Sequence, residues 1–154
     1  MTEQEGRFLV THADAESAVL KDVDRGQVHT LAENPGVEER EVIEGTVAPE
    51  PPMEVQYRLV DFESRCRLSV EHSAEPPTKQ ERDIAAEQPE GELTTRERAG
   101  TGELHVLTVP DSETEAAVED VLDDEGTLAR AARLGVNRVE IRSDDGVVSV
   151  RYLP

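Results

Sequence analysis

The fold class is decided by the segment from Glu103 to Leu153, which reads ELHVLTVPDSETEAAVEDVLDDEGTLARAARLGVNRVEIRSDDGVVSVRYL. Its first residues, 103–109, alternate between apolar and polar as a half-buried strand does. Its last residues form two further strand-like runs, 138–142 and 147–152, around the turn sequence SDDG. An Asp-Gly pair between such runs is typical of a tight β-hairpin.

Two helices are predicted between these strands. Pro110 precedes Ser112, and Glu115 follows three residues later, which is the pattern of a capping box. Gly126 then interrupts the apolar spacing, and Thr127 is expected to cap a second helix that ends at Gly135 in a left-handed conformation. The resulting order, β-α-α-β-β, predicts a sheet with helices over one face.

Upstream of this module, prolines and glycines mark a connecting region. Thr78 and Glu81 form a second capping-box pattern, so a short helix is expected over 79–88, ended by Pro89 and Gly91. The sequence Gly100-Thr101-Gly102 precedes a strand and lacks the residues of a phosphate-binding loop. It is therefore expected to be a turn.

The N-terminal part is predicted to be a series of strands joined by turns. Five strand-like runs cover 7–12, 18–23, 27–31, 41–48 and 55–72. In the last run the apolar parity changes at Leu59-Val60, which indicates a bulge or a break into two strands. Short strands with one strongly bent element favour a small barrel of OB or SH3-like kind. The fold prediction is α+β, with a barrel-like module over 1–75, a short helix and connecting segment over 76–102, and a β-α-α-β-β module over 103–154.

The composition is acidic and poor in lysine. The 154 residues include 35 Asp and Glu against 16 Lys and Arg, a formal net charge of -19, and Lys21 and Lys79 are the only lysines. Self-repulsion at this charge is screened at about 1 M salt, where the Debye length is ~3 Å. We therefore expect a halophilic protein of a potassium-rich cytoplasm, the alternative being an ordinary acidic mesophilic protein. No apolar run approaches the ~20 residues of a membrane span, so no membrane partner is expected.

Motifs for catalysis or metal binding are not evident. Cys66 is the sole cysteine, which excludes an internal disulfide, and it is expected to be a small buried residue rather than a reactive thiol. His12, Asp14 and Glu16 alternate like ligands on a strand, but the run 13–17 is better explained as a turn with local side-chain bonds. We predict no cofactor, no metal and no catalytic residue, and the chain is expected to be a binding module more than an enzyme.

The C-terminal hairpin is locally basic, in contrast to the acidic run before it. A cross-strand cluster of Arg138, Arg142 and Arg151 is expected on the face opposite Val139 and Ile141. Two explanations remain open: the arginines pair with surface acids of the same chain, or they contact a phosphate or an acidic partner. The candidate residues for contact with a protein partner or for self-association are Arg130, Arg133, Arg138, Arg142, Arg151 and His105.

Two other functions are kept as alternatives. A barrel could bind nucleic acid along the 55–72 run, if its rings are exposed for base stacking. Tyr57 and Phe62, the two rings of this run, are expected to lie in the core, which weighs against this alternative. The residues for that interaction are Arg58, Arg65, Arg67, Tyr57 and Phe62. An enzyme site between the two modules, around His105 and the 100–102 turn, would require a carboxylate or second histidine within hydrogen-bond reach of His105.

Four stretches of the sequence are similar to those of one known family. APEPPMEV (48–55), AGTGELHVLTVP (99–110), TLARAARLGV (127–136) and VVSVRYLP (147–154) resemble an uncharacterised family of small acidic haloarchaeal proteins. The resemblance extends from RFLVTHAD (7–14) to the C-terminus. It implies a haloarchaeal cytoplasmic origin, and it implies no activity, cofactor or site residue, because that family has none assigned.

Overall fold

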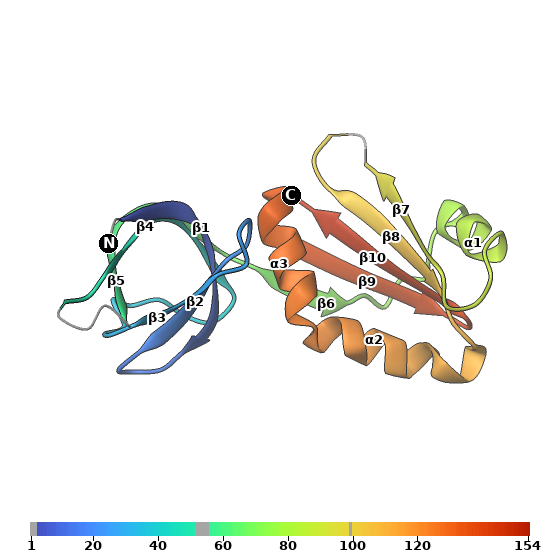
Figure 1. Cartoon of the computed structure of the whole chain (residues 1–154). Helices are drawn as coiled ribbons and strands as arrows, with labels where there is room; N and C mark the ends of the chain where they lie inside the picture. Colours follow the sequence, from blue (N-terminus) through green and yellow to red (C-terminus); the bar gives the residue numbers. More distant parts are fainter. Residues whose placement is uncertain (1–2, 52–55, 99) are drawn as a thin grey trace. The chain divides into compact units, whose positions relative to one another are not determined.

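The structure is a computed structural model that describes residues 3–51, 56–98 and 100–154. The chain divides into two compact units, drawn in Figure 1. The first comprises Met1–Leu68 together with Leu128–Arg133, and the second comprises Ser69–Thr127 together with Leu134–Pro154. The α+β prediction is confirmed: a closed barrel is followed by a second sheet with helices.

The first unit is a five-stranded closed barrel with the strand order β1-β2-β3-β5-β4. Its strands are β1 (Gln4–Ala13), β2 (Ala18–Asp22), β3 (Val28–Leu31), β4 (Glu41–Pro49) and β5 (Tyr57–Arg67). Every pair is antiparallel except β3 with β5, which are parallel and joined at a single bridge, Leu31 to Tyr57. This is the small barrel that the turn-rich N-terminal sequence predicts.

Mainly aliphatic side chains fill the barrel around the buried ring of Phe8, in keeping with the low aromatic content. The buried cluster consists of Phe8, Val10, Ala18, Leu20, Leu31, Val37, Ile43 and Val47. The turn at Asn34-Pro35-Gly36 is held by the Asn34 side chain, whose Oδ1 accepts the N–H groups of Gly36 and Val37, both at 2.8 Å. Asparagine supports such a turn by bonding to the backbone two residues on.

Strand β5 is bulged twice against β4. Val60 and Glu63 have no residue opposite them, because Val47 pairs with Leu59, Thr46 with Asp61, Gly45 with Phe62 and Glu44 with Ser64. The parity change in the sequence therefore corresponds to a bulge at Val60. Gly45 allows the close approach at this point, since a Cβ there would lie 2.3 Å from the Asp61 carbonyl oxygen. The break between two strands comes later, at Leu68.

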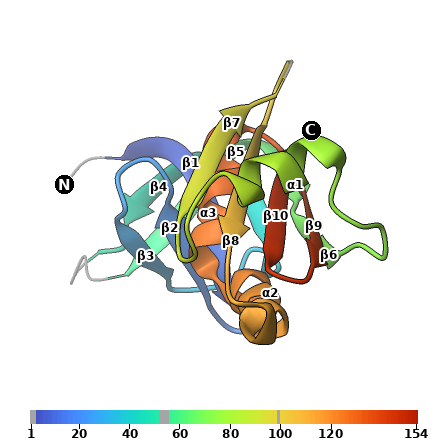
Figure 2. The same cartoon turned by 90° about the vertical axis from the view of Figure 1, so that its right-hand side faces the viewer.

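The second unit is a five-stranded sheet in the order β6-β9-β10-β8-β7. Its strands are β6 (Ser69–His72), β7 (Leu93–Glu97), β8 (Glu103–Thr108), β9 (Arg138–Asp144) and β10 (Val147–Leu153). The helix α1 (Lys79–Ala86) packs on one face, where Ala85 contacts Leu104 and Val106. Figure 2 shows α1 beside β8 and β10. A second helix, α2 (Thr114–Asp123), contacts β6, β9 and β10 and covers the buried side chains of the opposite face, which include Val139 and Ile141.

The 55–72 run does not form one barrel element. Its last four residues are β6, which pairs in parallel with β9 in the other sheet. Strand β7 was not expected, because the 76–102 segment was predicted to hold only a helix and a connection. The expected β8-α2-α3-β9-β10 order is confirmed, including the two-residue loop at Asp145-Gly146, where Gly146 has a φ of 81°. No helix within the described residues is long and apolar enough to cross a membrane.

Helix starts were predicted with mixed success. The capping box of α1 is present, with Thr78 Oγ1 accepting the Glu81 N–H and Glu81 accepting the Thr78 N–H. The box expected at Ser112 is absent, because a 3₁₀ turn (Asp111–Glu113) intervenes and α2 starts at Thr114 without a side-chain cap. The next helix, α3 (Glu125–Leu134), includes Gly126 and Thr127; Asp124 Oδ1, not Thr127, accepts the Gly126 N–H at its start. A preceding aspartate thus replaces the predicted threonine cap.

Candidate functional site

The most unusual surface of the first unit is the second half of β5. From Val60 to Arg67 every residue is exposed, although the strand is one wall of a closed barrel. A strand of a barrel normally buries alternate side chains. Here Val60 is 38% exposed and Phe62 is 49% exposed, which places two large apolar side chains in solvent on one strand.

One edge of β5 is also without a strand partner. Strand β4 pairs with β5 from Tyr57 to Arg67, whereas on the other side β3 meets β5 only at Tyr57 among the residues that the structure describes. An unpaired edge presents backbone N–H and C=O groups to any extended chain that reaches it. The end of β5 is bound to the loop before β4, since the N–H of Leu68, the next residue, donates to the Arg40 carbonyl at 2.8 Å.

The two arginines near the end of β5 are held by carboxylates of the same unit. Arg65 donates to Glu41 through Nε at 2.7 Å and through Nη2 at 2.8 Å, a bidentate pair. The hydrogen bond from Arg65 holds the pKa of Glu41 below its ordinary value, against the opposing effect of burial. Arg67 lies 3.2 Å from Glu38, with both side chains mostly in solvent. Arg58 is exposed at the other end of the strand.

The two aromatic rings of β5 differ in environment. Tyr57 is half-buried against the barrel core and contacts the His29 ring edge-on, with centroids 4.4 Å apart. Phe62 is exposed. Continuous stacking of successive bases requires several exposed rings. The strand therefore offers one exposed ring, flanked by polar residues, and not a two-ring platform.

Cys66 lies on the same exposed stretch, and the expectation that it is buried is wrong. It pairs with Val42 of β4. Partial desolvation raises the pKa of its thiol, and the Glu44 and Glu41 carboxylates raise it further. A thiol with a raised pKa is a weak nucleophile at neutral pH, because the thiolate is the reactive form.

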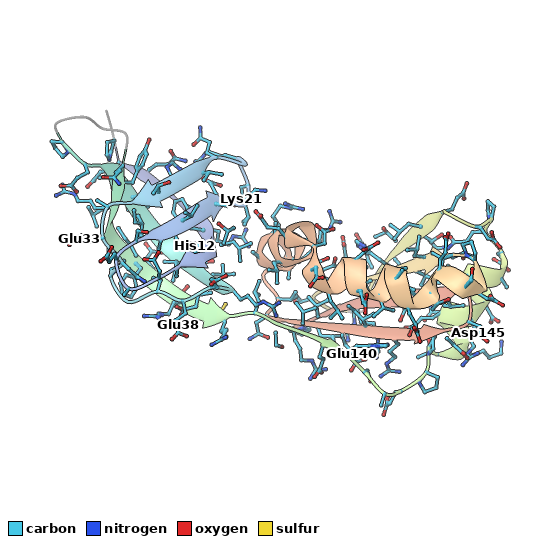
Figure 3. The ribbon with its side chains drawn as sticks, turned by 90° about the horizontal axis from the view of Figure 1, so that it is seen from below. His12, Lys21, Glu33, Glu38, Glu140 and Asp145 are labelled. Atoms are coloured by element: carbon cyan, nitrogen blue, oxygen red, sulfur yellow. The ribbon has the colours of Figure 1, made fainter. Side chains whose placement is uncertain are left out.

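Three of the arginines predicted as contact residues, Arg138, Arg142 and Arg151, lie in the second unit. Two of these three share a carboxylate. Arg142 Nε lies 2.7 Å from Glu140 Oε1, and Arg151 Nη1 lies 2.8 Å from the same oxygen (Figure 3 labels Glu140). The cross-strand cluster expected on this face is therefore present for Arg142 and Arg151. Arg138 is exposed at the first residue of β9.

This network extends to two further carboxylates. Arg142 Nη2 lies 2.9 Å from Glu75, and Arg151 Nε lies 3.6 Å from Glu81, which is 2% exposed and also accepts from Ser149 Oγ at 3.0 Å. Burial would raise the pKa of Glu140, but the hydrogen bonds and charges of its two arginines outweigh this and hold that pKa below the ordinary value. These arginines are engaged within the chain.

The other two arginines predicted as contact residues, Arg130 and Arg133, belong to the first unit. Arg133 is exposed and its Nη1 donates to the Val23 carbonyl at 3.4 Å, within the first unit. Arg130 is half-buried and has a partner within the chain. The six residues proposed from sequence are thus distributed over both units.

His105 has a carboxylate within hydrogen-bond distance. Its Nε2 lies 3.0 Å from Glu103 Oε2, and its ring lies 4.9 Å from the ring of Tyr152. Both members of the His105–Glu103 pair are about 15% exposed. His105 pairs with Val150 in the sheet, so it lies on the face opposite Leu104 and Val106, as the alternation predicts.

His12 and Asp14 form a turn-associated pair. Asp14 Oδ1 accepts the N–H groups of Glu16 and Ser17, both at 2.8 Å, and these bonds lower the pKa of Asp14. His12 Nε2 lies 3.5 Å from Asp14, with both side chains in solvent. Over residues 3–51, 56–98 and 100–154, no group of three His, Cys, Asp or Glu side chains is arranged to hold a metal ion.

Sequence reasoning missed the exposed character of β5, although a signal was present. The run Asp61-Phe62-Glu63-Ser64-Arg65 has polar residues at both parities, and such a run cannot bury one face of a strand. Val60 was interpreted only as part of a bulge. No pattern in the sequence pointed to Arg96, in the unexpected β7, or to Arg98 just after it.

Comparisons with known proteins give a family but no function. A search of curated proteins and a search of solved structures each returned no match to this chain. The model of a family of unknown function, DUF5812, matches residues 4–143, which is most of the barrel and most of the second unit. The chain therefore belongs to the family of unknown function DUF5812.

Proposed function

We propose that this chain is a non-enzymatic protein-interaction module, and that its barrel binds an extended segment of a partner protein, or of a second copy, along β5. The observation that carries the proposal is the uninterrupted exposure of Val60–Arg67 on a strand with one free edge. Strand addition supplies backbone hydrogen bonds for affinity, while side chains at alternate positions give specificity.

The bulges make the strand suited to such an interaction. Val60 and Glu63 have no partner residue on β4. Bulges of this kind bend the strand and change the directions of the neighbouring side chains. Val60 and Phe62 then provide apolar contact area on the surface. Apolar contacts keep their strength in concentrated salt, whereas exposed ion pairs lose most of theirs.

The excess of acidic residues is consistent with a cytoplasm of high salt concentration. We infer that the protein works in a potassium-rich haloarchaeal cytoplasm, on the basis of its net charge of -19 and its two lysines. In that setting an interaction module gains from apolar recognition. Arg142 and Arg151 already pair with a carboxylate of their own unit, so the positive charge of the hairpin is partly neutralised before any acidic partner binds.

Nucleic-acid binding by the barrel is the second candidate function. Its support is the exposure of Phe62 and Arg58 on one strand of a five-stranded barrel, a fold type that binds single strands elsewhere. The placement of Tyr57 against the barrel core weakens it.

Cys66 allows a direct test, since it is the sole cysteine and lies exposed on β5. The full chain is labelled at Cys66 with a benzophenone maleimide at mildly alkaline pH, because its thiol pKa is raised. It is then irradiated in lysate of the source organism kept at multimolar KCl. The matched variants are Val60→Ser with Phe62→Ser, and Val28→Ser, which alters another exposed apolar residue of the barrel.

The proposal expects one dominant protein crosslink, or a dimer of the chain, in wild type and in Val28→Ser. That crosslink should be lost in the Val60/Phe62 double variant. Crosslinks to nucleic acid in place of protein would establish the alternative. Equal crosslinking of all three proteins, or none in any, would contradict β5 as the binding strand.

A further inference from the structure

A cavity of about 340 Å³ lies in the second unit, beside the start of α1. This volume is within the range of small-molecule sites. It is lined by Thr78, Gln80, Glu81, Arg96, Glu97, Arg98, Leu104 and Arg151. Three of the sixteen basic residues of a chain with 35 acidic ones thus meet in one cavity.

The sheet register explains why the arginines converge. Leu104 of β8 pairs with Arg96 of β7 on one side and with Arg151 of β10 on the other. Directly opposed residues point to the same face of a sheet, so Arg96 and Arg151 flank the buried Leu104 on the α1 face. Arg98 follows Arg96 by two residues and continues the same row.

The charges of Arg96 and Arg98 are not matched by carboxylates. In the part of the chain that the structure describes, Arg96 Nη1 donates to the Thr95 carbonyl at 3.2 Å and Arg98 Nη1 donates to the Thr101 carbonyl at 2.9 Å. Neither forms an ion pair there. Arg151 differs, because Glu140 and Glu81 hold it in place.

The remaining wall of the cavity is the N-terminal turn of α1. A helix N-terminus favours negative charge, because its first N–H groups lack acceptors inside the helix. The Glu81 carboxylate does not oppose an anion freely, since the Thr78 N–H, Ser149 and Arg151 engage it. The exposed Glu97 carboxylate also lines the cavity, so three arginines and the helix N-terminus face two carboxylates, of which Glu81 is already engaged.

We propose that this cavity binds a small molecule that carries a phosphate group. The guanidinium groups of Arg96 and Arg98 can each donate two hydrogen bonds to a phosphate group, whose oxygens can accept all of these bonds. A singly charged ion such as chloride cannot reproduce that arrangement, so selectivity persists in concentrated salt. Leu104 provides an apolar floor for the carbon part of the ligand. The proposal concerns a different unit and different residues from the β5 surface, and it stands or fails independently of it.

The test is an NMR titration of the ¹⁵N-labelled full chain with inorganic phosphate, pyrophosphate and acetate. KCl is adjusted so that ionic strength is constant throughout. The variants are Arg96→Gln, Arg98→Gln and the double variant. Arg138→Gln is the control, because Arg138 is exposed on the same sheet outside the cavity.

We expect saturable shifts confined to the start of α1 and to the residues around Leu104, with phosphate or pyrophosphate but not with acetate. Each arginine replaced should weaken the affinity about tenfold, since a hydrogen bond to a charged group contributes that much or more. The control should bind as wild type does. Non-saturable shifts, an unchanged affinity in the double variant, or saturable shifts elsewhere would each overturn the proposal. The unbound spectra of the variants establish that they are folded.

Discussion

His29 is a buried histidine whose replacement should both stabilise the barrel and remove a pH dependence. It lies on β3 with 3% of its surface exposed, between the rings of Phe8 and Tyr57. Neither ring nitrogen has a hydrogen-bond partner among the described residues. Burial lowers the pKa of His29, and the opposing charge of Asp22 does not compensate for it.

The magnitude follows from two terms. Leaving a buried polar group unsatisfied costs about 1–3 kcal/mol, and His29→Leu removes that cost. The same change loses ring contacts with Phe8 and Tyr57 that contribute about 0.5–1.5 kcal/mol. We therefore expect His29→Leu to raise the free energy of unfolding by about 1 kcal/mol at pH 7.5.

The pH dependence has a definite sign. The unfolded chain takes up a proton at His29 near the ordinary pKa of 6.5, whereas the folded chain takes it up only at lower pH. Between these two pKa values the unfolded state binds more protons, so the free energy of unfolding decreases as the pH falls below 6.5. One proton gives a slope of at most about 1.4 kcal/mol per pH unit.

Urea denaturation at fixed KCl, followed by circular dichroism from pH 8 to pH 5, measures both effects. Asp22 and Asp14 have lowered pKa values, so their contributions change well below this range. His12→Gln is the matched control, because it removes an imidazole from an exposed position instead of a buried one. An equal pH slope in wild type and His29→Leu would refute the assignment of this slope to His29.

Three further predictions concern the stability of the two units, each measured by urea denaturation at constant KCl. Gly45→Ala should cost about 2–3 kcal/mol or more, because its Cβ would meet the Asp61 carbonyl oxygen at 2.3 Å and backbone must move; an unchanged midpoint would exclude this close approach. Glu140→Gln should cost about 3 kcal/mol, since it leaves two shielded arginines without their shared carboxylate. This loss should shrink as the pH falls below the ordinary value of 4.5 and disappear only below the lowered pKa of Glu140, where the wild-type carboxylate is itself protonated. Thr78→Ala should cost about 1 kcal/mol through the lost capping bond, whereas Ser112→Ala, at the cap that does not form, should have little effect.

Local signals in the sequence predicted local structure well, and long-range pairing poorly. The capping box at Thr78 and the Asp145-Gly146 turn were predicted correctly, because the residues that determine them lie within four positions of one another. Residues 69–72 join the second sheet by pairing with β9, which begins about seventy residues later in the chain. The apolar alternation of 69–72 itself therefore could not reveal which sheet this segment joins. Strand β7 was missed because Leu93-Thr94-Thr95-Arg96-Glu97 buries none of its side chains fully and shows no clear apolar alternation.

The arginines illustrate the same limit at the level of sites. Arg142 and Arg151 were recognised as neighbours, since a hairpin fixes their register. Arg96 comes next to Arg151 only through β8, which pairs with both of their strands. A site assembled across three strands leaves no motif in the sequence, and its residues are identified only when the strand order is known.

The high-salt setting that we propose gives a reason for this division of the arginines. At molar concentration an exposed ion pair contributes little, so arginine stabilises such a protein mainly where its pair is shielded from solvent. Arg142 and Arg151 meet that condition, with 14% and 24% of their side chains exposed and carboxylates on both sides. Arg96 does not meet it, because it is exposed and, among the residues that the structure describes, bonds only to a backbone carbonyl. An arginine that adds little to folding, yet faces a cavity, is best explained by a ligand that reaches it; if Arg96→Gln proved to destabilise the fold as much as Glu140→Gln, that explanation would lose its basis.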